Sequence, residues 1–177
     1  MVYRLEIPVL ETDRLRLREF RPASDFEPYA DFYASDGTRF YGGPLNREQA
    51  WRTIAAMMGH WVMRGYGPWA VEEKASGAFC GIVGLYNPEG WPEREITWAI
   101  TEPKQRRGYA LEAAICAKRY ARDILGWDTA ASCIAEGNLG SIALAEKMGA
   151  TLYRRTAHSR HGQMLIYRHQ MHGLAAN

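Results

Sequence analysis

The segment from Glu95 to Ile124 constrains the fold of this chain more than any other part of its sequence. A β-branched run over 95–100 leads through a basic loop into a helical pattern that begins near Gly108. The apolar positions of that pattern step by three and four residues, as on the buried face of an amphipathic helix: Ala110, Ala114, Ala117, Ala121 and Ile124. A strand that runs directly into a packed helix predicts a sheet covered by helices.

The rest of the chain supplies further strands and helices. Leu15 and Leu17 alternate with Arg14, Arg16 and Arg18, which predicts a half-buried strand whose arginines face solvent. More strands are expected over 68–73, 79–85, 127–134, 150–154 and 163–168. This order predicts an α+β fold with a mixed, mostly antiparallel twisted sheet flanked by helices.

Capping signals mark three further helices. Ser24 with Glu27, and Asn46 with Gln49, have the spacing of capping boxes at the starts of two helices. A short helix is expected over 138–148, closed by Gly149 as its C′ glycine.

Length and composition favour one globular domain. The 177 residues, 47% of them apolar, fit a single domain over 1–177 with a core at about 10–168. A net charge of +2 is too small to predict a nucleic-acid surface. No signal-peptide pattern and no run of about 18 apolar residues is present, so no membrane partner and a cytoplasmic location are expected.

Cysteine and histidine spacing predicts neither a disulfide framework nor a metal site. The cysteines form no Cys-x-x-Cys pair, which favours buried, reduced thiols. His158 with His161, and His169 with His172, have spacings that a metal could use, but no carboxylate or cysteine pattern surrounds them. Solvent-exposed histidines and no bound metal are therefore expected.

The loop before the helix at Gly108 has the features of an anion site. A loop that opens a helix directs unpaired backbone N–H groups toward one point, beside the positive end of the helix dipole. Gly108 would allow close approach of a phosphate, and Lys104, Arg106 and Arg107 add positive charge. An ordinary basic loop at a helix start would show the same residues, so this pattern alone leaves both readings open.

Four motifs in order resemble the GNAT N-acetyltransferase superfamily over residues 10 to 168. Gln105-x-x-Gly108-x-Ala110 resembles its acyl-CoA loop. The run from Leu10 to Arg18 is similar to the opening strand of the Rim-type branch, which acetylates protein N-termini and a range of small amines. The segments 95–98 and 138–149 resemble that branch's Glu-Leu/Ile-Gly-Tyr and Asn-x-x-Ser motifs, although Thr97 and Trp98 replace the usual glycine and tyrosine.

The resemblance implies acetyl-CoA as cosubstrate and assigns residues to it. Two strands would splay apart near 95–100, and the pantetheine arm would pair with backbone at Trp98, Ala99 and Ile100. The pyrophosphate would lie on the loop Gln105, Arg106, Arg107, Gly108, Tyr109 and Ala110. Asn138 would hold the pantetheine or an ordered water and cap the helix after it; a pure cap is the alternative.

Two residues are candidates for the chemistry. Glu95 is the candidate general base, because an ammonium has no lone pair with which to attack. Its alternatives are a solvated strand carboxylate or an ion-pair partner of Arg94 or a nearby arginine. Ser141 could donate to the departing thiolate, although a serine in a first helical turn is as often structural.

These residues and the resemblance together predict an acetyl-CoA-dependent N-acetyltransferase. The expected acceptor is a primary amine, either a protein N-terminus or a small molecule, that attacks the thioester directly. An acyl-CoA-binding regulatory module without turnover is the alternative. The sequence leaves the acceptor amine and a homodimer open.

Overall fold

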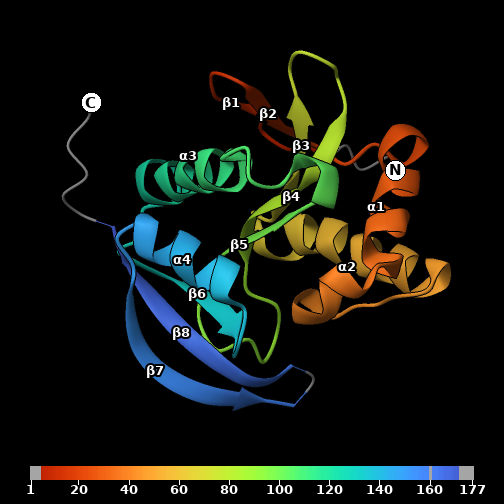
Figure 1. The fold of residues 1–177 in the computed structure, drawn as a ribbon. Helices are drawn as coiled ribbons and strands as arrows, with labels where there is room; N and C mark the ends of the chain where they lie inside the picture. The colour runs from red at the N-terminus through yellow and green to blue at the C-terminus, as the bar shows by residue number, and fades with distance from the viewer. Residues whose placement is uncertain (1–4, 160, 172–177) are drawn as a thin grey trace.

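The computed structural model describes residues 5–159 and 161–171. Its centre is an eight-stranded sheet with the strand order β1-β2-β3-β4-β5-β6-β8-β7 (Figure 1). The strands are β1 (Leu10–Glu11), β2 (Leu15–Arg18), β3 (Pro68–Glu73), β4 (Phe79–Tyr86), β5 (Glu95–Ile100), β6 (Thr129–Ala135), β7 (Thr151–His158) and β8 (Gly162–Gln170). All neighbouring pairs are antiparallel except β5 and β6. The predicted α+β fold is confirmed.

Four α-helices and two short 3-10 helices complete the chain that the structure describes. They are α1 (Pro22–Ala34), η1 (Asp36–Tyr41), α2 (Arg47–Arg64), η2 (Glu102–Lys104), α3 (Tyr109–Asp123) and α4 (Leu139–Lys147). The sequence did not predict η1. Of these helices, none is both long and apolar enough to cross a membrane.

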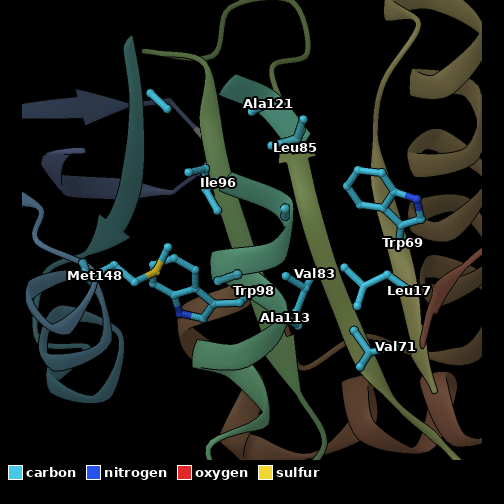
Figure 2. Packing of buried hydrophobic residues seen from close by; sticks show 14 of the residues in the cluster. Leu17, Trp69, Val71, Val83, Leu85, Ile96, Trp98, Ala113, Ala121 and Met148 are labelled. Carbon is cyan, nitrogen blue, oxygen red and sulfur yellow. The ribbon is translucent and has the colours of Figure 1, made fainter. Parts of the chain in front are cut away.

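Helices cover both faces of the sheet, and successive strand residues alternate between them. Ala70, Ile82 and Ala99 pack with α1 and α2. Their neighbours Val71, Val83 and Trp98 pack on the opposite face with the alanine stripe of α3 and with Met148 after α4 (Figure 2). The small side chains of α3 let this helix lie close to the sheet, which places its first turn at the end of β5.

The sheet opens between its two parallel strands. β4 pairs with β5 over the whole length of β5, and β8 pairs with β6 over the whole length of β6. β5 and β6 are in register at one position alone, Glu95 opposite Ala131. Beyond Glu95, therefore, the edge of β5 that is turned toward β6 has backbone groups without a strand partner, as the resemblance implied.

The predicted helix caps are partly right. Asn46 and Gln49 form the expected reciprocal capping box at the start of α2. The box at Ser24 is wrong, because α1 begins at Pro22 with Arg21 as its N-cap residue. The Asp25 carboxylate accepts a hydrogen bond from the Arg21 backbone N–H and so satisfies this helix start from inside the first turn.

Arg18 is a second correction. Arg14 and Arg16 are exposed or half-exposed as expected, but Arg18 is 2% exposed. Its guanidinium donates to both carboxylate oxygens of Asp25 and to Glu72 on β3. The alternation along β2 predicts that its arginines face solvent. At Arg18, however, α1 covers this face of the strand and supplies Asp25, whose carboxylate pairs with the buried guanidinium.

The histidines are also less exposed than predicted. His169 on β8 is 3% exposed and lies 2.9 Å from the Ser132 hydroxyl through Nε2. Burial lowers the pKa of His169 to about 3, and the nearby Lys118 charge adds to this effect. His158 and His161 are half-buried and pack against Trp91, while His172 lies outside the described residues. No group of three or more potential metal ligands occurs within residues 5–159 and 161–171.

Candidate functional site

A cavity of about 550 Å³ lies where β5 and β6 separate. The lining from β5, β6 and the first turn of α4 includes the buried residues Glu95, Asn138 and Ser141, and we call it the inner end. The lining from η1, α2 and the β7–β8 hairpin includes the exposed Arg39 and the half-buried His161, and we call it the outer end. The structure thus brings the predicted catalytic residues Glu95 and Ser141 into one cavity, with Trp98, Ala99 and Asn138 also in its wall.

Glu95 is buried in the cavity wall rather than solvated. The residue is 5% exposed, and its Oε2 accepts a 2.7 Å hydrogen bond from Trp91 Nε1. Its Oε1 accepts a 3.2 Å hydrogen bond from the Cys133 backbone N–H of β6. Arg94 pairs instead with Asp128. Within the residues that the structure describes, Glu95 forms no ion pair with any arginine. The alternatives that the sequence left open for Glu95, a solvated carboxylate and an ion pair with Arg94 or a nearby arginine, are therefore wrong.

Burial changes the proton affinity of Glu95. Loss of solvation raises the pKa of this carboxyl to about 8, and the two N–H donors from Cys133 and Trp91 oppose the rise by stabilising the charged form. A carboxyl with a pKa near the working pH can both accept and release a proton during turnover. A strongly perturbed carboxyl in a cavity is typical of a functional site.

We expect Trp91→Phe to move the acidic limb of the pH–rate profile upward. The variant keeps an aromatic ring but loses the indole N–H that stabilises ionised Glu95. A hydrogen bond to a charged group contributes about 1.5–3 kcal/mol, which corresponds to an upward pKa shift of about 1–2 units. Steady-state kcat measured from pH 6 to 10 would show a loss of about tenfold at pH 7 that closes at high pH.

Trp51→Phe is the matched control for this variant. Trp51 on α2 is 52% exposed and does not line the cavity. An unchanged inflection in Trp91→Phe, or an equal shift in both variants, would contradict a role for the Trp91 N–H.

Ser141 is held with its hydroxyl proton available. Trp98 Nε1 donates to Ser141 Oγ at 3.1 Å, so the serine oxygen acts as the acceptor in this bond. The Ser141 backbone N–H donates to Asn138 Oδ1, which makes Asn138 the N-cap of α4. The capping role predicted for Asn138 is confirmed. The tryptophan that replaces the usual tyrosine thus orients the serine hydroxyl, an arrangement that the sequence did not predict.

Asn138→Ala should lower the free energy of unfolding by about 1 kcal/mol, because the variant loses the N-cap of α4. Thermal denaturation would measure this loss. Asn138→Asp keeps an oxygen acceptor for the Ser141 N–H and should restore most of the stability. If Asn138 also contacts the cosubstrate, the KM for acetyl-CoA rises in the alanine variant; loss of stability without a change in KM would support a pure cap.

The predicted anion loop has the backbone geometry that an anion site requires. Gly108 is the N-cap residue of α3 and has a φ of +81°. Any other residue would be strained in this conformation, and its Cβ would lie 3.3 Å from Arg14 Nη2. Arg106 has a φ of +60°, the one positive value among the described non-glycine residues. Such a strained backbone conformation persists only where the surroundings hold it in place.

Arg14 fastens this loop through its side chain. Its guanidinium donates to the Arg107 carbonyl at 3.0 Å, forms an ion pair with Glu112 and lies over the Tyr109 ring. The alternation around Arg14 predicts a solvent-facing strand residue. It gives no indication of the contact with Arg107, which lies 93 residues later in the chain. Arg14 thus ties β2 to the start of α3.

Not every cation near the loop is available to a phosphate. Lys104 pairs with Glu73 at 2.7 Å, and Arg107 Nη1 lies 3.7 Å from the same carboxylate. Tyr109 also donates its hydroxyl to Glu73, and hydrogen bonds from Lys104, Ser76 and Tyr109 lower the pKa of Glu73 to about 2. Lys104 thus lies beside the loop as predicted from its position in the sequence, but its charge is already paired with Glu73. The backbone N–H groups of the first turn of α3 remain available to an anion. Glu112 is the first residue of this helix whose N–H donates to a backbone carbonyl, that of Gly108.

The Gln105 side chain is used within the protein. Its Nε2 donates to the Ile100 carbonyl at 2.8 Å, which fastens the loop to the end of β5. The side chain of Gln105 and the carbonyl of Ile100 thus satisfy each other, so the loop and the open edge of β5 form one continuous surface.

Comparison with known proteins decides the family. Residues 14–151 match the family model described as the acetyltransferase (GNAT) domain. The chain belongs to the GNAT acetyltransferase family. The matched residues include β5, β6, the loop at Gly108 and most of the cavity lining, whereas His161 and Met164 of the lining lie beyond them.

Three relatives illustrate the likeness. An acetyltransferase from Agrobacterium tumefaciens str. C58 has a TM-score of 0.85 and 32% identity, with 96% of this chain and 98% of that chain covered. The uncharacterized protein YkkB of Bacillus subtilis (strain 168) is 29% identical over 148 residues, 79% of this chain and 83% of that protein. A RimL ribosomal L7/L12 alpha-N-protein acetyltransferase has a TM-score of 0.75 at 12% identity, covering 92% of this chain and 94% of that chain, which is a likeness of fold alone.

Proposed function

We propose that this GNAT domain moves an acetyl group from acetyl-CoA to a primary amine by direct attack, with Glu95 as general base and Ser141 as hydrogen-bond donor to the leaving sulfur. The observation that carries the proposal is the buried carboxyl of Glu95 in the same cavity as the oriented hydroxyl of Ser141. The segments 10–18 and 138–149, which resemble motifs of the Rim-type branch, support placement in that branch.

The residues of this chain fit acetyl-CoA. The first turn of α3 presents backbone N–H groups beside the left-handed Gly108, which suits a pyrophosphate. On the edge of β5 that is turned toward β6, the carbonyls of Ile96 and Ile100 already accept from Ser132 and Gln105. The backbone of Trp98 between them is left to pair with an extended amide-bearing arm. Acetyl-CoA supplies the thioester that is attacked. We assign the pyrophosphate to the amides of Arg106 to Ala110, and the pantetheine arm to β5 and Asn138.

The proton steps balance with these two side chains. The new N–C bond forms as the C–S bond breaks, and the amine must lose one proton while the thiolate gains one. Glu95 accepts the proton from the amine, directly or through one water. Ser141 donates a hydrogen bond to the sulfur as the C–S bond breaks, since its oxygen already accepts from Trp98 and leaves the hydroxyl proton available. The CoA thiolate then takes the proton from protonated Glu95, directly or through water, which restores the ionised carboxylate.

The pKa of Glu95 favours an α-amine over a lysine side chain. An α-ammonium group has a pKa of about 7.7–8.0, so proton transfer to a carboxyl with a pKa of about 8 is nearly balanced. A lysine ammonium has a pKa of about 10.4, and the same transfer is uphill by about two units. We therefore infer that an α-amine is the better acceptor. The three free thiols Cys80, Cys116 and Cys133 agree with a reducing, cytoplasmic location.

A thiol-release assay tests the proposal. Purified protein, acetyl-CoA and a panel of peptides, amino acids, polyamines and aminoglycosides should release free CoA thiol in step with acetylated amine detected by mass spectrometry. Release without an acetylated product would show hydrolysis instead. Binding of CoA in titration calorimetry, with no thiol released by any amine, would support the alternative of a regulatory module.

A further inference from the structure

The charges in the wall of the cavity limit what kind of amine can enter it. Among the described lining residues, the only carboxylate is Glu95, at the inner end, whereas Arg39 and Arg52 contribute two guanidinium groups at the outer end. A site for a polyamine or an aminoglycoside needs several carboxylates to receive several ammonium groups. This cavity has the opposite balance, and a protonated Glu95 makes the wall more positive still.

The two arginines differ in how their charge is satisfied. Arg52 forms an i,i+4 ion pair with Glu48 on the exposed surface of α2. Arg39 forms no ion pair within residues 5–159 and 161–171; its guanidinium lies over the Phe40 ring, with Cζ 4.7 Å from the centroid. Stacking on an aromatic ring orients a guanidinium without using its N–H donors, which remain available to an anion.

Arg39 lies on a segment that spans the outer end of the cavity. Phe40, the next residue of η1, lies beside the turn before α4, since a Cβ added to Gly137 would be 3.8 Å from its Cε1. On the other side, a Cβ added to Gly42 would be 3.4 Å from Cε1 of His161 in the β7–β8 hairpin. His161 in turn packs against Trp91, the donor to Glu95. A continuous wall thus connects Arg39 with the proposed base.

We propose that Arg39 is an anion subsite for the acceptor, and that the acceptor is a monoamine that also carries a carboxylate. This inference rests on the proposed acetyl transfer. The amine lies toward Glu95 and the carboxylate toward Arg39, which binds it through paired N–H donors. The carboxylate can belong to a free amino acid or to an acidic residue near a peptide N-terminus, and both present the same chemistry.

Two substrate pairs measure the contribution of Arg39 to this preference. Phenylalanine and phenylalaninamide differ only in the α-carboxylate, and the peptides Ser-Asp-Phe-amide and Ser-Asn-Phe-amide differ only in a side-chain carboxylate. For each pair, the ratio of kcat/KM values is measured in the wild type and in Arg39→Gln. Differences in the amine pKa within a pair cancel, because both enzymes act on the same two compounds.

The wild type should prefer the acidic member of at least one pair, and Arg39→Gln should reduce that preference by about tenfold or more. The pair that responds identifies whether a free amino acid or a peptide supplies the carboxylate. Arg39→Lys should keep part of the preference, because it keeps the charge but not the planar fork. Arg47→Gln is the matched control, since Arg47 pairs with Glu27 and does not line the cavity.

Different outcomes of this experiment contradict the anion subsite and the proposed acetyl transfer. Acetyl transfer with ratios that Arg39→Gln leaves unchanged in both pairs would overturn the anion subsite and leave the acetyltransferase proposal standing. A higher kcat/KM for spermidine than for every acidic acceptor would also overturn it. Absence of thiol release with every acceptor would instead overturn the proposed function.

Discussion

Glu95→Gln should lower kcat by about 10²-fold at pH 8 with little change in the KM for acetyl-CoA. Glutamine keeps the size of the side chain and an oxygen acceptor but takes no proton from the amine. General-base catalysis contributes about 10²–10⁴-fold, and an α-amine that is already partly neutral needs the lower end of this range. The contacts assigned to acetyl-CoA lie along β5 and at α3, so its binding should persist.

The pH dependence of this loss distinguishes a base from a structural residue. Because the pKa of Glu95 is about 8, most of the wild-type protein holds a neutral carboxyl at pH 6 and resembles the variant. The difference in kcat should therefore widen from pH 6 to pH 8. It should narrow again at higher pH, where the free amine needs no base. Parallel profiles at all pH values would remove Glu95 from the proton transfer.

As the pH rises and Glu95 ionises, activity should increase while the free energy of unfolding decreases. A carboxyl whose pKa is higher in the folded than in the unfolded protein binds more protons in the folded state between those two values. Glu95 thus destabilises the fold progressively as the pH rises from about 4.5 through about 8. Glu95→Gln lacks this ionisation, although its amide NH2 faces one of the two N–H donors that the carboxylate accepts. The Tm of the wild type should therefore fall relative to that of the variant as the pH rises from 5 to 9, and a Tm difference that does not change with pH would contradict the raised pKa.

Arg18→Ala should lower the free energy of unfolding by about 3–5 kcal/mol, because it leaves the buried carboxylate of Asp25 without an ion-pair partner among the described residues and leaves Glu72 with only the more exposed Arg16 and Arg21. Asp25 would also hold the start of α1 less firmly, since its Oδ2 accepts from both Arg18 and the Arg21 N–H. Urea denaturation followed by circular dichroism measures the loss.

Arg16→Ala provides the comparison on the same strand. Arg16 is 40% exposed and pairs with the exposed Glu11 and also with Glu72 at 2.9 Å. Because Glu72 keeps Arg18 in this variant, no buried carboxylate loses its cation, and the change should be about 1 kcal/mol. Equal losses in the Arg16 and Arg18 variants would contradict the assignment of a buried ion-pair network beneath α1.

Sequence patterns predicted the helix ends correctly where the capping residue and the backbone group that it caps lie within a few residues of each other. The Asn46–Gln49 box, the cap at Asn138 and the left-handed glycine after α4 are of this kind. The Ser24 box was wrong although Pro22, a residue favoured in a first helical turn, marked the true start. Arg18 was misread because its burial depends on α1, which the alternation along β2 does not show.

The candidate site was predictable in its residue identities but not in its electrostatics. The resemblance to GNAT acetyltransferases named Glu95 and Ser141, and the structure places both in one cavity. The raised pKa of Glu95 arises from burial against β6 and the loop at Trp91, residues that reach it only through the tertiary fold. Arg39 lies on η1, a short 3-10 helix without a periodic pattern long enough to predict it.

The most direct test of the central claim is the titration of the Glu95 carboxyl itself. In protein labelled with ¹³C at the glutamate side-chain carboxyl, one resonance should titrate with a midpoint near pH 8, and this resonance should be absent in Glu95→Gln. The acidic limb of the wild-type kcat profile should have the same inflection. If every glutamate resonance titrates below pH 6, Glu95 is an ordinary ionised carboxylate and the account of it as a burial-tuned base is contradicted.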